Sequence, residues 1–453
     1  MDRIGDIAAT LRATVLRGED AAPNRIVHDS RDLAEGDLFV ALRGTRTDGH
    51  VYLHDAFSRG ACGALVSDLS QVPDNARNLI LVDDTLDALQ RIASSWRQRL
   101  EATFVGITGS NGKTTTRALL AHLLRGPTNP DRIYTAPKNY NTEIGLPLAL
   151  LAMPEIAQIG LFELGAERPG DIVTLAELLR ADVGLVTTIG PSHLDSFGSI
   201  DAVAEEKWAL VERLPNGGLA ILNADIPALR RRAAQAPCRT VTAGLEHGEV
   251  RGSIERELPS LRLAVVDPPM RLDCPILGAH HAANLLLAAV AANQLGVAPD
   301  AIEERAASFE PVPHRLQSID AAFGTILDDT YNANPVSTAG ALRTLAGLGG
   351  PHTHRVFVFG EMRDLGGDAP RYHREILDLA IDLGIDAIHP IGEQAVAVCR
   401  ARTSAAIEIV ERADLPATLR VSLANGNDRI VLFKGSRALG LDRLVEDLLA
   451  VDQ

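Results

Sequence analysis

Residues 106–116 constrain the fold of this chain more than any other segment. They read Gly-Ile-Thr-Gly-Ser-Asn-Gly-Lys-Thr-Thr-Thr and follow the apolar residues 103–105 directly. An apolar run, a glycine-rich turn and helix-compatible residues in this order predict a strand that leads through a tight loop into a helix. Backbone N–H groups in such a loop, together with the N-terminus of the helix, form a site for phosphate groups. The segment therefore predicts an α/β domain that binds ATP or GTP.

The residue types in this loop indicate how a triphosphate would be held. Lys113 is placed to reach the β- and γ-phosphates, and the hydroxyl of Thr114 is placed to ligate Mg²⁺. The spacing departs by one place from the pattern G-x-x-x-x-G-K-[ST], because position 107 is Ile and the glycines fall at 106 and 109. We call residues 108–115 the phosphate loop. The nucleotide is expected to contact all of them, namely Thr108, Gly109, Ser110, Asn111, Gly112, Lys113, Thr114 and Thr115.

Composition and charge exclude several classes of protein. The chain has 453 residues, enough for three domains of ordinary size. Its 46% hydrophobic and 23% charged residues are typical of a globular protein and argue against disorder. The formal net charge of -15 argues against a nucleic-acid partner, since binding a polyanion requires a basic face.

Cysteine usage and the N-terminus bear on the compartment. The four cysteines show no C-x-x-C pair and no ligand-like spacing with histidine, so neither a disulfide framework nor a zinc site is expected. Residues 1–6 lack the basic start and the apolar core of a signal peptide. No apolar run approaches the ~18 residues that span a bilayer. The sequence therefore predicts a cytoplasmic protein without membrane insertion.

The first two thirds of the chain are expected to form two domains. Residues 1–100 precede the phosphate loop and predict a small N-terminal α/β domain with buried strands at 37–42 and 61–66. Within residues 101–312, short apolar runs alternate with helical stretches, which predicts a mostly parallel sheet with helices on both faces. Strands are expected there at 159–163, 183–188 and 219–222, and the charged, proline-containing segment 249–273 is expected to form an inserted hairpin.

A third domain is expected after residue 312. The sequence Pro311-Val312-Pro313 predicts a stiff hinge, because two prolines disfavour helix. The alternation of apolar and helical segments then restarts, which predicts a smaller α/β domain over residues 313–453. Its strands are expected at 325–327, 356–359, 387–391 and 430–433.

Three polar residues of the central domain could lie near the γ-phosphate. Glu163 ends an apolar strand, and sites in open α/β sheets form at such strand ends. His193 lies in the polar turn that follows the strand at 183–188, and Lys207 follows two acidic residues near the start of a helix. Taken singly, each has an ordinary alternative, because Glu163 could be a solvated charge, His193 a structural histidine and Lys207 part of a solvated helix face.

Taken together, these segments resemble the Mur ligases, the ATP-dependent enzymes that build the peptide stem of bacterial peptidoglycan. The loop of that family is T-G-[ST]-N-G-K-[ST]-[ST], which is present here at residues 108–115. The resemblance implies that two Mg²⁺ ions are bound through Thr114, Glu163, His193 and Lys207. It also implies that Lys207, fourteen positions after His193, carries a carbamate. A carbamate would replace a cation by an anion, which suits a two-metal phosphate site.

Further motifs extend the resemblance over nearly the whole chain and imply additional ATP contacts. Residues 278–284 resemble the segment G-x-H-N-x-x-N that binds adenine, in which Asn284 matches but His281 stands where Asn is expected. Arg315 resembles the arginine that opens the C-terminal domain. Residues 328–334 resemble D-D-[ST]-Y-N-A-N, which places Asp329 and Asn332 near the ribose and phosphates. The segments 360–366 and 434–437 complete the pattern.

Other motifs point to one reaction within the family, the addition of D-alanyl-D-alanine to a UDP-N-acetylmuramoyl-tripeptide. Residues 139–147 resemble the substrate loop N-x-N-[NT]-E-I-G-x-P, and residues 28–31 and 36–44 resemble the uridine-diphosphate pocket. Residues 368–371 read Asp-Ala-Pro-Arg, close to the D-N-P-R of a neighbouring ligase, but they lack the Asn and are expected to open a helix. The implied substrate contacts are Ser30, Arg31, Asn139, Asn141 and Thr142.

The resemblance also implies a three-domain Mur ligase architecture, with a central P-loop domain and a Rossmann-like C-terminal domain, and a monomeric enzyme. The substrate carboxylate would attack the γ-phosphorus to give an acyl phosphate, which the amine of the dipeptide would convert to the amide. Two alternatives stay open at this point. One is another ligase of the same fold, either a stem-peptide or a folylpolyglutamate-type enzyme, and the other is a non-catalytic P-loop protein that uses ATP as a switch.

Overall fold

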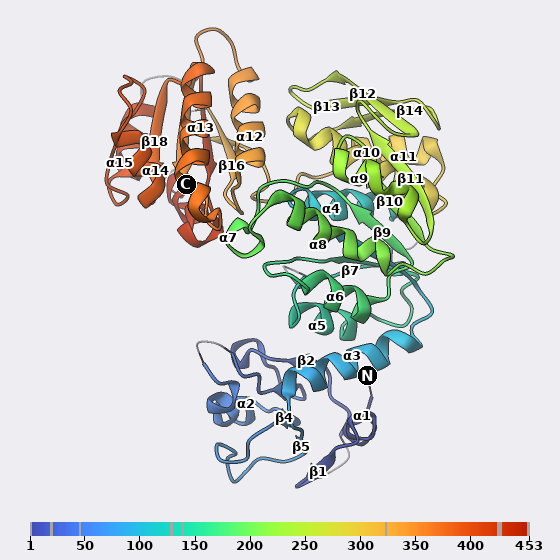
Figure 1. Ribbon diagram of the computed structural model, residues 1–453. Helices are drawn as coiled ribbons and strands as arrows, with labels where there is room; N and C mark the ends of the chain where they lie inside the picture. The colour runs from blue at the N-terminus through green and yellow to red at the C-terminus, as the bar shows by residue number, and fades with distance from the viewer. Residues whose placement is uncertain are drawn as a thin grey trace.

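Three sheets follow one another along the chain in the computed structural model, which describes residues 2–18, 21–44, 47–126, 130–137, 140–321, 324–423 and 428–450. In Figure 1 the N-terminal sheet lies at the bottom, the central sheet above it, and the C-terminal sheet at the upper left. This arrangement confirms the predicted three-part α/β fold. No helix within these described ranges has the length and apolar character needed to cross a membrane.

The N-terminal sheet has five strands in the order β1-β5-β4-β3-β2. Strand β1 runs antiparallel to β5, and the other neighbours are parallel. The predicted strands at 37–42 and 61–66 are confirmed as shorter elements, β3 and β4, whose residues are all buried. Helix α3 packs against α1 and against α5 of the central region, so it connects the two. The bounds are α1 Ile4–Leu11, β1 Thr14–Leu16, β2 Ile26–Val27, β3 Leu38–Val40, α2 Leu53–Ser58, β4 Gly63–Val66, β5 Leu79–Leu81 and α3 Thr85–Arg99.

The central sheet has nine strands in the order β14-β13-β12-β11-β10-β9-β6-β8-β7. All neighbours from β7 to β12 are parallel, and β13 runs antiparallel to both of its neighbours, β12 and β14. The strands predicted at 159–163, 183–188 and 219–222 are confirmed as β8, β9 and β10, although β9 ends at Val186. The bounds are β6 Thr103–Thr108, β7 Ile133–Thr135, β8 Ile159–Glu163, β9 Val183–Val186, β10 Leu219–Asn223, β11 Arg239–Gly244, β12 Val250–Arg256, β13 Leu261–Val265 and β14 Met270–Cys274.

The prediction of an inserted hairpin at 249–273 is wrong in one respect. The segment forms three strands, and the first of them, β12, extends the main sheet by pairing parallel to β11. Buried and half-buried residues alternate along β13, so that Leu261, Leu263 and Val265 are buried while Arg262 and Ala264 between them are not. This alternation gives the meander one face that belongs to the central core, which is why it continues the sheet instead of standing apart from it.

Helices cover both faces of the central sheet, as predicted. Alternate residues of β6 belong to different core clusters, since Phe104 packs with α6 and α8, whereas Val105 packs with α4 and α10. Successive side chains of a strand point to opposite faces, so these clusters are the two layers that flank the sheet. The bounds are α4 Lys113–Leu124, α5 Gly145–Leu151, α6 Asp171–Leu179, α7 Leu194–Phe197, α8 Ile200–Glu212, α9 Pro227–Arg232, α10 Ala282–Gln294 and α11 Pro299–Ala307.

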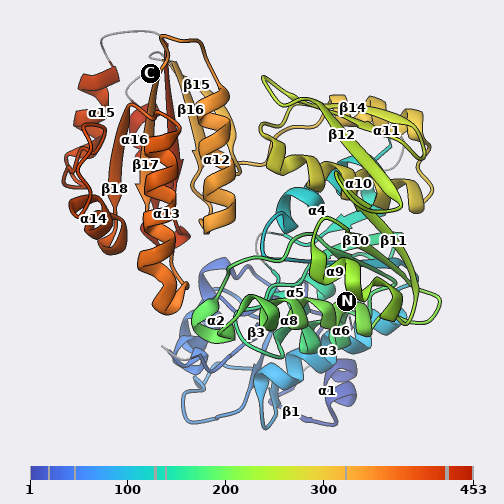
Figure 2. The same cartoon turned by 45° about the horizontal axis from the view of Figure 1, so that its top comes forward.

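The C-terminal sheet has five strands in the order β15-β16-β19-β17-β18, parallel except for the edge strand β15. Its four predicted strands are confirmed. Helices α12 and α13 lie on the side of this sheet that faces the viewer in Figure 2. Residues 369–371 open α13 with a proline in the first turn, as expected. The bounds are β15 Gln317–Ala321, β16 Gly324–Asp329, α12 Pro335–Gly347, β17 His354–Gly360, α13 Ala369–Asp382, β18 Ala387–Ile391, α14 Glu393–Arg400, α15 Leu415–Leu423, β19 Arg429–Lys434 and α16 Leu441–Leu449.

Candidate active site

The phosphate loop leaves the carboxyl end of β6 and enters α4, as the sequence predicts. Gly109 and Gly112 have φ angles of 145° and 82°, values that residues with a side chain rarely adopt. Space is also limiting, because a Cβ atom at Gly112 would lie 2.2 Å from Asn284 Oδ1. The glycines therefore permit both the turn and the close approach of α10 to the loop.

The turn after β9 holds the phosphate loop in place. The backbone N–H of Asn111 donates to Thr188 Oγ1 at 2.8 Å, and Thr187 Oγ1 donates to the carbonyl of Asn111 at 2.5 Å. The hydroxyl of Ser110 donates to the carbonyl of Gly190 at 3.0 Å. These bonds explain why β9 ends at Val186, since the two threonines leave the sheet to bind the loop. The loop is thus fixed before any nucleotide binds.

A cavity of about 610 Å³ opens above this loop and brings together residues from distant parts of the chain. Among the described residues, those predicted to bind ATP all line the cavity except Thr108, which is buried and donates to the carbonyl of Leu164 at 2.9 Å. Thr108 therefore supports the loop from beneath. The predicted residues that line the cavity outside the loop are Asn141, Thr142, Glu163, His193, Lys207, Asn284, Arg315, Asp329 and Asn332.

Thr114 and Glu163 provide two oxygen ligands side by side. Thr114 Oγ1 donates to Glu163 Oε2 at 3.1 Å and accepts a hydrogen bond from Arg315 Nη2 at 3.1 Å. Mg²⁺ is bound through oxygen atoms and in phosphate sites takes only one or two protein ligands. The two side chains therefore fit a magnesium ion that also contacts phosphate. The described residues contain no cluster of three or more His, Cys, Asp or Glu side chains that would form a cage for a metal.

Lys207 is buried on α8, with an exposed fraction of 2%. Burial, together with the nearby charge of Lys113, lowers the pKa of its ammonium group to about 7. Among the described residues, none forms a hydrogen bond or an ion pair with this ammonium. Its neighbour Glu206 accepts the backbone N–H groups of Gly170 and Ile172 at 2.8 and 2.6 Å, and so caps the start of α6. The alternative of a solvated helix face at Lys207 is therefore wrong.

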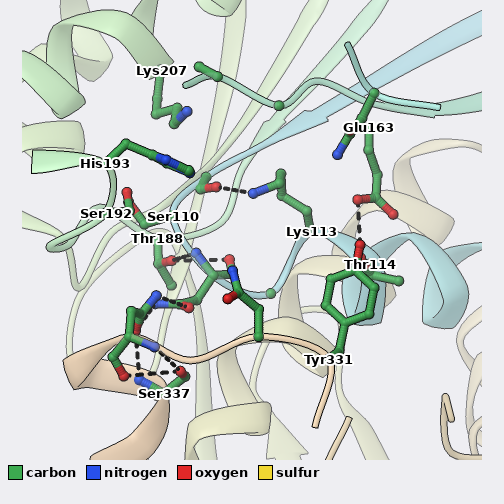
Figure 3. Close-up of a pocket in the computed structure, with 18 of the residues that line it drawn as sticks. Ser110, Lys113, Thr114, Glu163, Thr188, Ser192, His193, Lys207, Tyr331 and Ser337 are labelled. Atoms are coloured by element: carbon green, nitrogen blue, oxygen red, sulfur yellow. Dashed lines mark hydrogen bonds between the residues drawn. The ribbon is translucent and has the colours of Figure 1, made fainter. Parts of the chain in front are cut away.

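Lys113 lies between two groups of side chains in Figure 3, with Lys207 and His193 on one side and Thr114 and Glu163 on the other. Its ammonium donates to the carbonyl of Gly109 at 2.6 Å, and burial lowers its pKa. Burial also lowers the pKa of His193, so its ring is neutral at neutral pH and can accept a metal or a hydrogen bond. The pair Thr114 and Glu163 and the pair His193 and Lys207 thus lie on opposite sides of Lys113.

The C-terminal region supplies the far wall of the cavity. Arg315 stacks on the ring of Tyr331 at 3.7 Å. Asp329 Oδ2 accepts a hydrogen bond from Lys434 Nζ at 2.6 Å, and the same ammonium donates to the carbonyl of Asn332 at 3.0 Å. Lys434 therefore fixes two of the three C-terminal residues that were predicted to contact the nucleotide, Asp329 and Asn332.

Four residues with a place in this site were not predicted individually. Tyr331, Asn334 and Lys434 lie within motifs that the sequence shows, but only their neighbours were assigned a role. Asn334 exchanges hydrogen bonds with Asn111 of the phosphate loop. Arg117 forms an ion pair with Glu163 and carried no motif signal, because its partner is far away in the sequence.

Asn284 and the substrate loop also lie at the cavity. Asn284 Nδ2 is 3.2 Å from Nδ1 of His281, the residue that departs from the expected Asn, and its Oδ1 accepts from Thr116 at 3.4 Å. The carbonyl of Asn141 accepts the N–H of Gly165 at 2.8 Å, and the hydroxyl of Thr142 accepts the N–H of Gly145 at 3.2 Å. Asn139 lies outside the described residues.

Ser30 and Arg31 do not line the cavity that contains the phosphate loop. Ser30 is buried at the start of a short helical turn, and the exposed guanidinium of Arg31 pairs with Asp29 at 2.6 Å. The two residues predicted to bind the uridine diphosphate therefore lie outside the phosphate-loop cavity, and their role stays a prediction.

Three parts of the chain match known protein families. Residues 24–97 match the Mur ligase family, catalytic domain, residues 107–292 match the Mur ligase middle domain, and residues 314–437 match the Mur ligase, glutamate ligase domain. The UDP-N-acetylmuramoyl-tripeptide--D-alanyl-D-alanine ligase of Synechocystis is 34% identical over 95% of this chain and 93% of its own length.

Two solved structures resemble the whole chain. MurF from Acinetobacter baumannii has a TM-score of 0.88 and 27% identity, and the comparison covers 99% of each chain. The MurF ligase from Thermotoga maritima in complex with ADP has a TM-score of 0.82 and 27% identity, over 94% of this chain and 97% of the other.

Proposed function

Because this chain belongs to the Mur ligase family, we propose that it joins D-alanyl-D-alanine to UDP-N-acetylmuramoyl-tripeptide with the conversion of ATP to ADP and phosphate. The product is the nucleotide-linked pentapeptide from which peptidoglycan is made. The observation that carries the proposal is the single cavity in which the phosphate loop meets Glu163, His193, Lys207 and Arg315. Full-length similarity to ligases of this specificity supports the choice of substrates.

The phosphate loop binds and orients ATP in this proposal. Backbone N–H groups from Gly109 to Lys113 surround the phosphates, and the ammonium of Lys113 exchanges the carbonyl of Gly109 for the β- and γ-phosphates. Asn284, Arg315, Asp329 and Asn332 contact the rest of the nucleotide. Arg315 reaches the γ-phosphate side of the cavity, because its guanidinium already contacts Thr114. A guanidinium at this place balances charge that develops during phosphoryl transfer.

Thr114 and Glu163 would hold one Mg²⁺ ion in this proposal, and His193 and Lys207 would hold a second. Bound Mg²⁺ supplies charge neutralisation of the phosphates and orientation of the substrate carboxylate. Imidazole is a poor ligand for Mg²⁺ and an ammonium group is none, so the second site needs an anion. A carbamate on Lys207 provides it. A lysine whose pKa is about 7 has a substantial neutral fraction at neutral pH, unlike a lysine of ordinary pKa, and the neutral amine is the form that reacts with carbon dioxide.

The chain's own residues then exclude water and position the reactants. The substrate carboxylate attacks the γ-phosphorus, which releases ADP and forms an acyl phosphate. The amine of D-alanyl-D-alanine attacks the acyl carbon, and phosphate leaves. Acyl phosphates hydrolyse readily, so the C-terminal region must cover the site, and its contacts through Arg315 and Asn334 support that role. Residues 311–313 are the proposed pivot.

Each of the three regions has a proposed task. Residues 1–100 bind the uridine nucleotide through Ser30 and Arg31, since a guanidinium suits a diphosphate. Residues 101–312 bind ATP and, through Asn139, Asn141 and Thr142, the peptide end of the substrate. Residues 313–453 close the site and receive the dipeptide. We further propose that the enzyme acts as a monomer in the cytoplasm, where ATP and nucleotide-linked precursors occur.

A coupled ADP-release assay over the four nucleotide-muramyl substrates of the pathway and their amine partners tests this function. We expect turnover only when the tripeptide nucleotide and D-alanyl-D-alanine are both present, with glycine, D-alanine and diaminopimelate as poor amines. Faster turnover with a single amino acid would move the protein to another step of the pathway. ADP release without either cosubstrate would instead favour the alternative of an ATP switch.

A further inference from the structure

We propose that Arg117 is a positioning residue, which holds the carboxylate of Glu163 in the orientation that binds metal and ties it to the base of the substrate loop. This inference rests on the proposed role of Glu163 as a ligand to Mg²⁺. Arg117 is not part of the loop motif, and it lies on α4 one helical turn after Thr114.

Both oxygen atoms of Glu163 contact residues of the same turn of α4. Arg117 Nε lies 2.9 Å from Oε1 in an ion pair without a hydrogen bond, and Thr114 Oγ1 donates a hydrogen bond to Oε2 at 3.1 Å. The terminal torsion of a glutamate side chain has broad minima, so a carboxylate with only one contact rotates easily. Contacts at both of its oxygen atoms fix the plane of the Glu163 carboxylate. The oxygen that faces Thr114 is then held where a metal bound to that hydroxyl would need it.

The ion pair between Arg117 and Glu163 is poorly accessible to solvent. The side chains are 12% and 8% exposed, so water screens their attraction much less than at the surface. Removing one member of such a pair leaves the other without compensation. The positive charge of Arg117 balances the negative charge of Glu163, and Arg117 itself does not line the phosphate-loop cavity.

The other end of the guanidinium binds the backbone that leads to the substrate loop. Arg117 Nη1 donates to the carbonyl of Ala136. The N–H of Ala136 donates to the carbonyl of Leu161 on β8 at 3.1 Å, two residues before Glu163. One planar guanidinium therefore spans the metal-binding carboxylate and the segment that precedes Asn141. The contact with Glu163 is an ion pair in which Nε makes no hydrogen bond, and the contact with Ala136 is a hydrogen bond. An ammonium group has a single nitrogen, so lysine could replace one of these contacts but not both.

Arg117 acts through Glu163 and not on the reactants. It is absent from the described residues that line the phosphate-loop cavity, and it lines a second cavity of about 450 Å³ together with His122 and Arg125. Groups that orient a metal ligand typically change metal affinity or activity by 10- to 100-fold when they are removed. That range sets the expected effect for Arg117.

The test measures the binding of Mn²⁺ to the full chain in the presence of a non-hydrolysable ATP analogue, by the loss of the free-ion signal in electron paramagnetic resonance. Arg117→Met keeps the length of the side chain and removes the guanidinium, and we expect Mn²⁺ to bind about 10- to 100-fold more weakly. The Mn²⁺ affinity of Arg117→Lys should lie between the affinities of Arg117→Met and the wild type. Arg125→Met, which changes an exposed arginine of the same cavity, should bind as the wild type does.

Variants of Glu163 separate this inference from the proposed function. If Glu163→Gln weakens Mn²⁺ binding and adding Arg117→Met weakens it no further, Arg117 acts through Glu163 as proposed. Normal binding by a folded Arg117→Met protein, beside weak binding by Glu163→Gln, would overturn the inference and leave the metal role of Glu163 standing. Normal binding by Glu163→Gln would overturn the metal role itself. Should Arg117→Met fail to fold, Arg117→Lys decides, since wild-type Mn²⁺ affinity in that variant would overturn the need for a guanidinium that contacts both Glu163 and Ala136.

Discussion

The side-chain amides of Asn111 and Asn334 donate hydrogen bonds to each other between the phosphate loop and the first residue before α12. The two Nδ2–Oδ1 distances are 3.2 and 2.5 Å. Asn334 is also the N-cap of α12, where its Oδ1 accepts the N–H of Ser337 at 3.0 Å. Asn334 of the C-terminal region thus contacts the phosphate loop directly. A movement of the C-terminal region away from the loop must break both bonds.

Asn334→Asp should lower turnover while it leaves the stability of the protein nearly unchanged. Aspartate is as good an N-cap as asparagine, so α12 keeps its cap, but a carboxylate cannot donate to Asn111 Oδ1. The loss of one hydrogen bond of ordinary strength predicts a decrease in kcat of about threefold to tenfold. Steady-state kinetics with thermal unfolding measure the two effects, and Ser337→Ala, which loses only the reciprocal part of the capping box, is the control. Wild-type turnover in Asn334→Asp would exclude the pair from the mechanism.

Lys207→Ala should lose nearly all activity, on the order of a thousandfold, because the second metal site would lack its anion. Binding of ATP should stay nearly intact, since the phosphate loop is unchanged. Short carboxylic acids such as acetate should restore part of the activity by placing a carboxylate where the carbamate would be. Glu205→Ala, a change at an exposed residue of the same helix that pairs with Arg232, is the matched control. Full activity in Lys207→Ala would refute the role of this residue.

The pH dependence of stability gives a separate check on the burial of Lys207. Its pKa is lowered from 10.5 to about 7 in the folded protein, so between these values the unfolded chain binds the proton and the folded chain does not. Stability must therefore rise with pH across this window, at a slope of up to about 1.4 kcal/mol per pH unit. Urea unfolding in buffer free of carbon dioxide, compared with Lys207→Met, isolates this contribution. If the stability of the two proteins changes with pH in the same way, folding does not lower the pKa of Lys207.

Local patterns predicted the fold well, and long-range contacts account for what they missed. The apolar run at 159–163 matches β8 residue for residue, because a strand buried on both faces is uniformly apolar. The run at 183–188 was predicted too long, since Thr187 and Thr188 bind Asn111 instead of continuing the sheet. No local pattern separates Val250–Arg256 as an added sheet strand from one arm of an isolated hairpin, because its parallel pairing with β11 decides it.

The candidate site shows the same division. The spacing of Lys207 from His193 predicted its position in the site, but its two acidic neighbours concealed its burial, because Glu206 turns inward to cap α6. Arg117 could not be predicted, since its partner Glu163 arrives from another strand. Motifs report the residues that touch ligands, whereas the residues that hold them in place depend on the fold.

Arg315→Ala should reduce kcat by on the order of a hundredfold and leave the binding of the uridine nucleotide unchanged. Arg315 contacts Thr114 and stacks on Tyr331, whereas Ser30 and Arg31 lie outside this cavity. Tyr331→Leu removes only the stacking partner and should have a much smaller effect. Stopped-flow kinetics and calorimetry with the uridine nucleotide measure the two quantities. Small-angle scattering with and without ligands should show a smaller radius of gyration in the complex, and an unchanged radius with a fully active Arg315→Ala would rule out closure.

The central claim is that a substrate carboxylate attacks ATP and that the resulting acyl phosphate is taken up by D-alanyl-D-alanine. The most direct measurement uses UDP-N-acetylmuramoyl-tripeptide labelled with ¹⁸O in its terminal carboxylate, and mass spectrometry of the products. The account predicts the pentapeptide nucleotide together with one ¹⁸O atom in each phosphate released, because the oxygen that attacks the γ-phosphorus leaves with it. Unlabelled phosphate, or ADP formed without the pentapeptide product, would contradict the account.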